Sequence, residues 1–227
     1  PPFCCEAAGM TVALEGLHAV KHALRFAPRL VASVVVRDLA QARALAHQLA
    51  PDIADQLLAL ATTGEVGHPT GVEGLAVRPP EARAVLHTRT SPLVLLDGPR
   101  HPGNAGAVIR VAAAAGASGV ALTGRLDPWH PAVVRGSAGL HFALPVLAAE
   151  PHEVTGPLLV LDADGDRLAD VPDDAVLVVG SERAGVGNEL RSRAAGVVRL
   201  PMREGVSSLN LATAAAAVLY SWRLRKG

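Results

Sequence analysis

The sequence predicts an α/β protein built around a parallel β-sheet, and three observations support this fold class. From residue 93 onward, short uninterrupted apolar runs alternate with helical segments, which is typical of a parallel sheet covered on both faces. Half of the 227 residues (50%) are hydrophobic, enough for one large domain or for a main domain with a small companion. Only 3% are aromatic, so the core must be built from Ala, Val and Leu.

Residues 10–78 predict a small α/β domain that precedes the main one. Leu17, Val20 and Leu24 lie on one face of a helix expected at 16–25. The pattern predicts further helices at 39–49 and 52–60, short strands at 34–36 and 75–77, and an exposed loop rich in Gly, Pro and His at 62–74. Residues 79–91 are punctuated by proline and are expected to form a linker.

Residues 92–227 predict the main domain, in which strands and helices alternate. Strands are expected at 93–97, 119–123, 158–161, 176–179 and 197–200, and helices at 105–116, 131–137 and 188–195, with a final helix that opens at Ser207-Ser208. Ligands of parallel sheets bind beyond the carboxyl ends of the strands. Three loops fall at such ends, namely 97–104, 180–187 and 201–208, so the sequence predicts one ligand site formed by all three.

The first of these loops leads into a helix that carries two polar residues. Asn104 suits a helix N-cap. Arg110 stands between Ile109 and Val111 in a helix nearly free of other charge, so it is expected to meet an anion or a functional site. A capping Asn and an ordinary surface Arg would explain the same two residues.

The second and third loops each carry polar groups beyond a strand. Residues 180–187 form a Gly-rich turn, but neither G-x-G-x-x-G nor a P-loop Lys is present. Glu182 would repel a phosphate and suits a cationic ligand or a hydroxyl, although a simple helix cap is an equal alternative. Ser208 and Asn210 place two polar side chains at a helix start where one cap would suffice, which indicates possible chemistry.

Taken together, the three loops resemble the three motifs of the SpoU/TrmH family of RNA 2′-O-ribose methyltransferases. The matching segments, in the same order and with similar separation, are Asn104-Ala-Gly-Ala-Val-Ile-Arg110, Val179-Gly-Ser-Glu-Arg-Ala-Gly185 and Leu200-Pro-Met-Arg-Glu-Gly-Val-Ser-Ser-Leu-Asn210. The resemblance extends from about residue 93 to the end of the chain. Residues 16–77 resemble the small ribosomal-protein-L30e-like substrate domain of several members, although Thr70 stands where the family loop often carries Gln.

The resemblance implies a SPOUT fold with a C-terminal trefoil knot, S-adenosylmethionine as the methyl donor, and a homodimer with sites near the subunit interface. By position, the resemblance implies that Gly180, Leu200, Met202 and Leu209 bind the cofactor. The residues it places in the catalytic site are Asn104, Arg110, Glu182, Ser208 and Asn210.

In the implied reaction, a ribose 2′-hydroxyl attacks the methyl carbon of the donor sulfonium. The family assigns the base to Arg110, but a guanidinium keeps its proton at neutral pH. Arg110 is therefore expected to bind a neighbouring phosphate and to stabilise the emerging alkoxide, and to act as the base only if its surroundings lower its pKa severely. Glu182 is the alternative base. Ser208 and Asn210 would orient the ribose or close the pocket, and Asn104 would fix Arg110 or its loop.

Charge and composition constrain the partners. Lys and Arg (21) balance Asp and Glu (21), so RNA contacts must depend on local clusters of basic residues. The candidates for RNA contact are Lys21, Arg25, Arg29, Arg37, Arg43, Arg78, Arg83 and Arg89. An ordinary solvated surface would also explain basic residues at these positions. The few aromatic residues argue against a stacking platform for single strands. Cys4 and Cys5 are adjacent, and His68 and His101 are isolated, so no disulfide framework and no metal site are expected.

No apolar run reaches membrane-spanning length, and residues 1–9 lack a signal pattern, with Met10 a possible initiator. These features predict a soluble cytoplasmic protein. Analogy favours ribosomal RNA over transfer RNA as the substrate. The alternatives are a transfer-RNA methyltransferase, a non-catalytic RNA-binding protein of the same fold, and a nucleotide-dependent enzyme of doubly wound type, against which the missing G-x-G-x-x-G counts.

Overall fold

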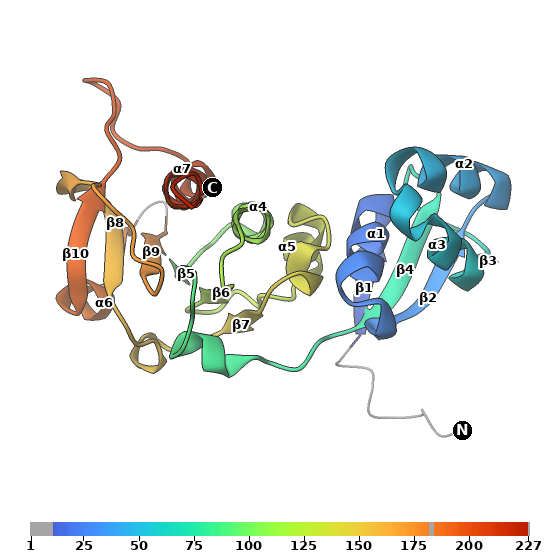
Figure 1. Ribbon diagram of the computed structural model, residues 1–227, viewed down its shortest axis with the longest axis horizontal. Coiled ribbons are helices and arrows are strands. Elements are labelled where there is room, and N and C mark those ends of the chain that lie inside the picture. The colour runs from blue at the N-terminus through green and yellow to red at the C-terminus, as the bar shows by residue number, and fades with distance from the viewer. Residues whose placement is uncertain (1–10, 182–183, 227) are drawn as a thin grey trace. The chain divides into compact units, whose positions relative to one another are not determined.

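The computed structural model describes residues 11–181 and 184–226, so Glu182, one of the predicted site residues, lies outside the described residues. The chain forms two compact units, whose elements are labelled in Figure 1. Unit 1 comprises the residues up to 80 together with 138–143, and unit 2 comprises residues 81–137 and 144–227. Each unit contains its own β-sheet.

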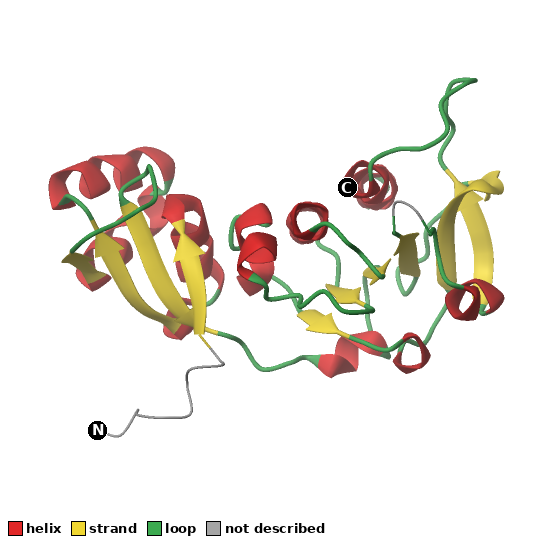
Figure 2. Cartoon of the chain, turned by 180° about the vertical axis from the view of Figure 1, so that it is seen from behind, coloured by secondary structure: helices red, strands yellow, loops and turns green. Residues whose placement is uncertain are grey.

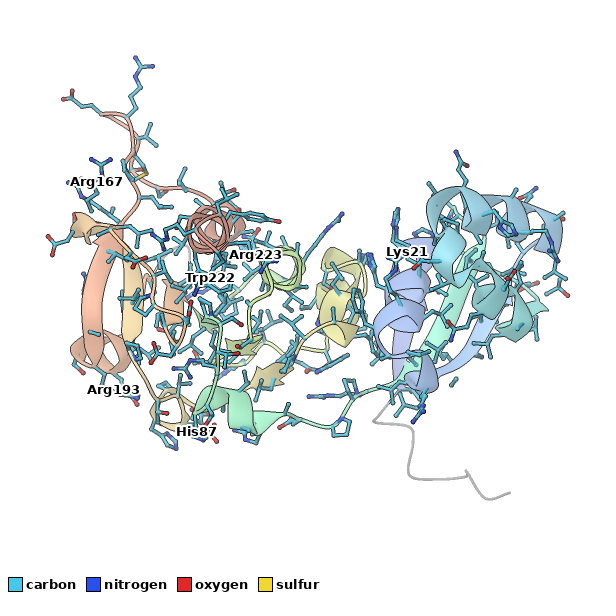
Figure 3. All side chains as sticks on the ribbon, viewed as in Figure 1. Lys21, His87, Arg167, Arg193, Trp222 and Arg223 are labelled. Atoms are coloured by element: carbon cyan, nitrogen blue, oxygen red, sulfur yellow. The ribbon has the colours of Figure 1, made fainter. Side chains whose placement is uncertain are left out.

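Unit 1 is a four-stranded sheet in the order β1-β4-β2-β3, with helices packed on it (Figure 2). Only β2 and β3 pair in parallel, whereas β4 is antiparallel to both β1 and β2. The strands are β1 (Thr11–Glu15), β2 (Val31–Val36), β3 (Ala61–Thr63) and β4 (Val72–Val77). The helices are α1 (Gly16–Phe26), α2 (Leu39–Leu49) and α3 (Ala54–Leu60), with 3₁₀ turns η2 (Pro28–Leu30), η3 (Pro51–Ile53) and η5 (Leu140–Phe142).

The helices predicted in this unit are confirmed, but two of its strands were not predicted. Leu17, Val20 and Leu24 are at most 1% exposed, as the spacing of apolar residues on α1 required. The sequence analysis missed β1, and β3 lies partly in the stretch expected to be an exposed loop. Both strands are short and partly exposed, so neither has a continuous apolar run to mark it.

Thr70, in the loop before β4, connects that loop to α1. Its hydroxyl accepts a hydrogen bond from the backbone N–H of Leu17 (3.2 Å), at the first turn of α1. The same hydroxyl lies 2.8 Å from Nδ1 of His68. Thr70 therefore ties the loop before β4 to the start of α1, which gives that free helix N–H group a partner.

Unit 2 is a six-stranded sheet in the order β10-β8-β9-β5-β6-β7, and every neighbouring pair is parallel, which confirms the predicted sheet. The strands are β5 (Leu93–Asp97), β6 (Gly119–Leu122), β7 (Val146–Ala148), β8 (Leu158–Arg167), β9 (Val176–Gly180) and β10 (Ala194–Arg199). The short β7 was not predicted, and β8 runs well beyond the expected 158–161.

The helices of unit 2 are α4 (Pro102–Ala115), α5 (Pro131–Gly136), α6 (Asn188–Ser192) and α7 (Leu211–Arg223), with 3₁₀ turns η4 (Arg83–Leu86) and η6 (Pro151–Glu153). As predicted, α4 ends at Gly116, which adopts the left-handed conformation (φ 78°) that favours glycine. The helix expected at 188–195 is shorter than predicted, because the chain is already in β10 at Ala194.

Helical segments cover both faces of this sheet. On one face, Leu93, Leu95 and Val178 pack in a buried cluster with Val85 and Leu86 of η4 and with residues of α6. On the other face, α4 contacts β6 and α7 contacts β9, and the two helices also pack on each other (Figure 1). Two residues of the stretch expected to be a linker, Val85 and Leu86, are thus part of the core of unit 2.

Candidate active site at the carboxyl ends of the sheet

The three loops predicted to meet are joined to one another by hydrogen bonds. The Oδ2 atom of Asp97, at the end of β5, accepts a hydrogen bond from the backbone N–H of Gly187, beyond β9 (2.7 Å). The Nδ2 group of Asn210, in the loop after β10, donates to Oδ1 of Asn104 on α4 (3.2 Å). The first loop is therefore bonded to both of the others, across 90 and 106 residues of sequence.

Asp97 is the centre of this arrangement, and the sequence analysis did not give it a role. Its Oδ1 atom accepts from the hydroxyl of Thr123 (2.6 Å), and that hydroxyl accepts from the N–H of Gly98 (3.0 Å). The carboxylate thus holds together the loops that follow β5, β6 and β9. The signal in the sequence was a carboxylate that directly ends a continuous apolar strand.

The turn after β9 requires glycine at its first position. Ser181 and Gly185 exchange two backbone hydrogen bonds (3.1 and 3.0 Å), which close the turn. A Cβ atom on Gly180 would overlap the backbone of Gly185 and Val186, so only glycine allows this close approach. The described ends of the turn place Gly180, Ser181 and Gly185 together at one surface, while Glu182 lies outside the described residues.

The final helix begins later than predicted. Asn210 is the N-cap of α7, and its Oδ1 atom accepts from the N–H groups of Ala212 (2.9 Å) and Thr213 (3.4 Å). The expectation that the helix opens at Ser207-Ser208 is therefore wrong by three residues. Asn is a strong N-cap, and the residues before it form the extended loop that separates β10 from α7 in Figure 1.

Asn104 does not cap α4, contrary to the prediction. The helix starts at Pro102, a favourable first residue because its missing N–H needs no partner there, and the N-cap position belongs to His101. Asn104 therefore lies inside the first turn. Its side chain instead accepts the hydrogen bond from Asn210, which makes it a link between α4 and the loop after β10.

A cavity of about 430 Å³ lies among the ends of β8, β9 and β10, the loop after β10, and the start of α7. Its volume falls in the range of small-molecule sites. All four residues expected at a cofactor line it, namely Gly180, Leu200, Met202 and Leu209. Of the residues expected in the catalytic site, Ser208 and Asn210 line it as well. Most of the remaining lining is apolar: Leu161, Ala163, Val179, Val198, Leu211 and Ala214.

Two charged side chains, Asp162 and Arg199, are found among the described residues that line this cavity. The Asp162 carboxylate forms an ion pair with Arg191 and accepts a hydrogen bond from the N–H of Asp164 (3.0 Å). The hydrogen bond from Arg191, followed by that from Asp164, lowers the pKa of Asp162. The sequence analysis missed Asp162, because the strand was expected to end before it.

Arg110 lies on the exposed side of α4, outside the cavity lining. Six residues separate it from Asn104, which is about 9 Å along a helix axis. No hydrogen bond or ion pair to another residue of 11–181 or 184–226 holds its guanidinium. The exposed side of α4 that carries Arg110 is called the open edge from here on. Arg100 and Arg125, in the loops that follow β5 and β6, are exposed as well, and these two loops approach each other at Gly98 and Gly124.

Two features are absent from the part of the chain that the structure describes. No group of three or more His, Cys, Asp or Glu side chains is placed to hold a metal ion there. Within the same residues, no helix is both long enough and apolar enough to cross a membrane.

Comparison with known proteins gives related sequences over most of the chain. A relative in Bacillus subtilis, the 23S rRNA (guanosine(2553)-2′-O)-methyltransferase RlmP, is 30% identical over 230 residues, covering 94% of this chain and 88% of the relative. The 23S rRNA (uridine(2479)-2′-O)-methyltransferase of Streptomyces viridochromogenes is 35% identical over 170 residues, covering 63% of this chain. That match and one to a Streptomyces laurentii relative span only 59% and 60% of those proteins' length.

Solved structures and a family sequence model agree with these matches. The crystal structure of the SpoU methyltransferase AviRb from Streptomyces viridochromogenes in complex with AdoMet superposes with a TM-score of 0.77, at 27% identity, covering 96% of this chain and 91% of AviRb. Residues 91–220 match the sequence model of the SpoU rRNA Methylase family, and these residues contain the three joined loops and the cavity. The chain therefore belongs to the SpoU rRNA methylase family.

Proposed function

We propose that this protein is an RNA methyltransferase that transfers a methyl group from S-adenosylmethionine to a ribose 2′-hydroxyl in ribosomal RNA. The observation that carries the proposal is the hydrogen bond between Asn210 and Asn104. It joins a cavity of ligand size to the open edge of α4, where Arg110 is exposed. Methyl transfer needs such a pair of sites, because the donor and the acceptor must be held in line with each other.

The cavity fits the proposed cofactor. Leu200, Leu209 and Val179 offer apolar surface for an adenine ring, and the tight turn at Gly180 brings backbone groups to the cavity wall. When bound, S-adenosylmethionine supplies a methyl carbon made electrophilic by its sulfonium. The AdoMet bound in the AviRb crystal structure, a neighbour of this fold, supports the same assignment.

Each polar side chain of the site has a proposed role. Arg110 binds a phosphate next to the target ribose and stabilises the alkoxide that forms as the 2′-hydroxyl loses its proton. Glu182 is the alternative residue to accept that proton. Ser208 and Asn210 orient the ribose, and Asn104 fixes the loop after β10 through its bond to Asn210 rather than by contacting Arg110.

The RNA is proposed to contact local groups of arginines, since the whole chain has no net charge. In unit 2, Arg100, Arg110 and Arg125 are exposed. In unit 1, proposed here as an L30e-like substrate-binding domain (residues 10–78), Arg29 and Arg43 are exposed. Other candidates have internal partners instead: Arg25 binds Asp52 (2.6 Å), Arg37 binds the carbonyl of Val66 (2.6 Å), and Arg83 and Arg89 bind groups of unit 2.

We also propose that the protein is a homodimer with a C-terminal trefoil knot, and that it works in the cytoplasm without a metal ion. Exposed apolar residues along the loop after β10 and along α7 support a subunit contact: Val206 (46%), Leu209 (41%), Tyr220 (41%) and Leu224 (77% exposed). The knot is supported by the path of the chain, because β10 lies at one edge of the sheet whereas α7 contacts β9 and α4. Light scattering of the purified protein tests the dimer.

A methyl-transfer assay tests the proposal directly. The purified protein is incubated with isotope-labelled S-adenosylmethionine and with ribosomal or transfer RNA from cells that lack the gene, and modified nucleosides are identified by mass spectrometry. We expect one 2′-O-methyl nucleotide in ribosomal RNA. Methylation of transfer RNA alone would favour the transfer-RNA alternative. Cofactor binding without transfer to any RNA would favour a non-catalytic RNA-binding protein, and neither binding nor transfer would overturn the proposal.

A further inference from the structure

We propose that the Asp162 carboxylate binds the ribose hydroxyls of the cofactor's adenosine, an inference that rests on the proposed function. Asp162 follows Leu161, which pairs with Val179 across β8 and β9, so it stands level with Gly180 at the cavity wall. Among the described residues that line the cavity, it is the one acidic side chain. Most of the other residues that line the cavity are apolar, so the Asp162 oxygens are well suited to accept hydrogen bonds from a polar part of the ligand.

Asp162 is held in place before any ligand arrives. Its Oδ2 atom is bound by Arg191 of α6, and its Oδ1 atom accepts from the N–H of Asp164 (3.0 Å). Its side chain nevertheless remains 23% exposed. The two carboxylate oxygens can accept about four hydrogen bonds in all. Arg191, the N–H of Asp164 and, more weakly, the N–H of Ala163 use part of that capacity, so the carboxylate can still accept from a ligand. Because the pKa of Asp162 is lowered, chiefly by Arg191, the group is ionised at neutral pH and can only accept.

The ion pair decides which part of the ligand suits this position. Together, Asp162 and Arg191 carry no net charge, so a cationic ammonium group would gain little attraction there and would also approach the guanidinium. Two neighbouring ribose hydroxyls are neutral donors and match the two oxygens. Carboxylates beyond a strand of a parallel sheet bind ribose hydroxyls in other nucleotide-binding folds for the same reason.

Arg191 acts through Asp162 and is a positioning residue. Replacing it with Gln would remove the ion pair and free the carboxylate to rotate, whereas Lys would keep a cation in place. We therefore expect Arg191→Gln to weaken ligand binding and Arg191→Lys to restore much of it.

Calorimetry with two ligands tests the inference. S-adenosylhomocysteine contains the ribose and the amino-acid end, whereas 5′-methylthioadenosine contains the ribose alone. Loss of a hydrogen bond to a charged group costs about tenfold in affinity. We expect Asp162→Asn to weaken both ligands by about that factor. The control is Asp52→Asn, since Asp52 also pairs with an arginine (Arg25) but lies in unit 1, and both affinities should stay at the wild-type value.

Two outcomes with folded Asp162→Asn protein would overturn the inference. One is affinity within twofold of the wild type for both ligands. The other is weaker binding of S-adenosylhomocysteine alone, which would assign Asp162 to the amino-acid end.

A second measurement does not depend on how the variant folds. The wild type should bind the 2′,3′-dideoxy analogue of 5′-methylthioadenosine about tenfold more weakly than the parent, and equal affinity would overturn the inference. If the wild type binds neither S-adenosylhomocysteine nor 5′-methylthioadenosine, the proposed function itself fails.

Discussion

The cavity and the open edge of α4 are joined by the hydrogen bond between Asn210 and Asn104, and they are built in different ways. The cavity is formed by tight backbone contacts and internal bonds: Gly180 lies against Gly185, and Asp162 is bound to Arg191. At the open edge, the Arg110 guanidinium is exposed and has no hydrogen-bond or ion-pair partner among residues 11–181 and 184–226.

This difference matches the two binding steps of the proposed reaction, namely binding of the methyl donor and binding of the RNA. A small donor can be bound by a cavity that exists beforehand, which limits the loss of freedom of the protein on binding. A large RNA brings its own phosphates, so the protein can leave a cation exposed for them. Changes to the cavity should therefore affect cofactor affinity, and changes to the edge should affect turnover.

The largest expected effect is at the open edge. Arg110→Ala should reduce methyl transfer by about 100-fold or more, because it removes the group proposed to stabilise the developing alkoxide. The affinity for S-adenosylhomocysteine should remain within about twofold, since Arg110 does not line the cavity. Turnover within a few-fold of the wild type would remove Arg110 from its central role. Glu182→Gln is tested in parallel. If this variant loses turnover but still binds the cofactor, the base role belongs to Glu182.

The next largest effect is in the cavity. Gly180→Ala should weaken S-adenosylhomocysteine by tenfold or more in calorimetry, because the added Cβ overlaps the backbone of Gly185 and must displace the turn. Gly103→Ala is the control, because Gly103 does not line the cavity and its added Cβ would meet no atom of the described residues. Equal losses in the two variants would contradict the close-packed account of the cavity.

A smaller effect is expected at the bond that joins the two regions. Asn210→Ala removes the cap of α7 and should lower the free energy of unfolding by about 1 kcal/mol in urea titrations. Asn104→Ala removes the acceptor of this bond and leaves the Asn210 cap in place. It should therefore keep most of the stability of the wild type yet transfer methyl groups about tenfold more slowly, by the loss of alignment. Wild-type turnover in Asn104→Ala would show that the bond does not couple the regions.

The smallest expected effect is a pH dependence of stability. The folded-state pKa of Asp162 is lowered below the usual value of 3.8, so its ion pair stabilises the fold above that pH. This contribution is lost as the pH falls through the lowered value. The difference in melting temperature between the wild type and Asp162→Asn should be constant at neutral pH and should shrink in acid. In an Arg191→Gln background the pH-dependent difference should be smaller, because only the backbone hydrogen bonds, chiefly that from Asp164, still favour the ionised carboxylate. An undiminished difference would exclude the ion pair as its main cause.

Much of the fold was predictable because apolar residues follow simple periods. The run Leu93–Asp97 could only be a buried strand, and Leu17, Val20 and Leu24 could only share a helical face. The candidate site followed from the rule that strand ends gather at one edge of a parallel sheet. Elements without a clear period were missed, such as β7 and the polar extension of β8 that begins at Asp162.

Single polar residues were harder to interpret. Asn and Ser are both good N-caps, so the sequence predicted that α7 opens at Ser207-Ser208 and that Asn104 suits the N-cap of α4, whereas Asn210 caps α7 in the structure. Asn210 is the N-cap because the extended loop after β10 ends at this residue. Pro102 set the start of α4, which released Asn104 to bind Asn210.

The sequence by itself determined the parallel sheet, the three loops and the residue types gathered in them, because burial patterns and turn chemistry are local properties of the chain. Only the tertiary structure decided that Asp97 bonds to Gly187, that Asn210 reaches Asn104, and that Asp162 lines the cavity beside Gly180. A hydrogen bond depends on distances of about 3 Å, and the partners in two of these contacts are 90 and 106 residues apart. No local pattern fixes such a distance; the packing of the whole sheet does.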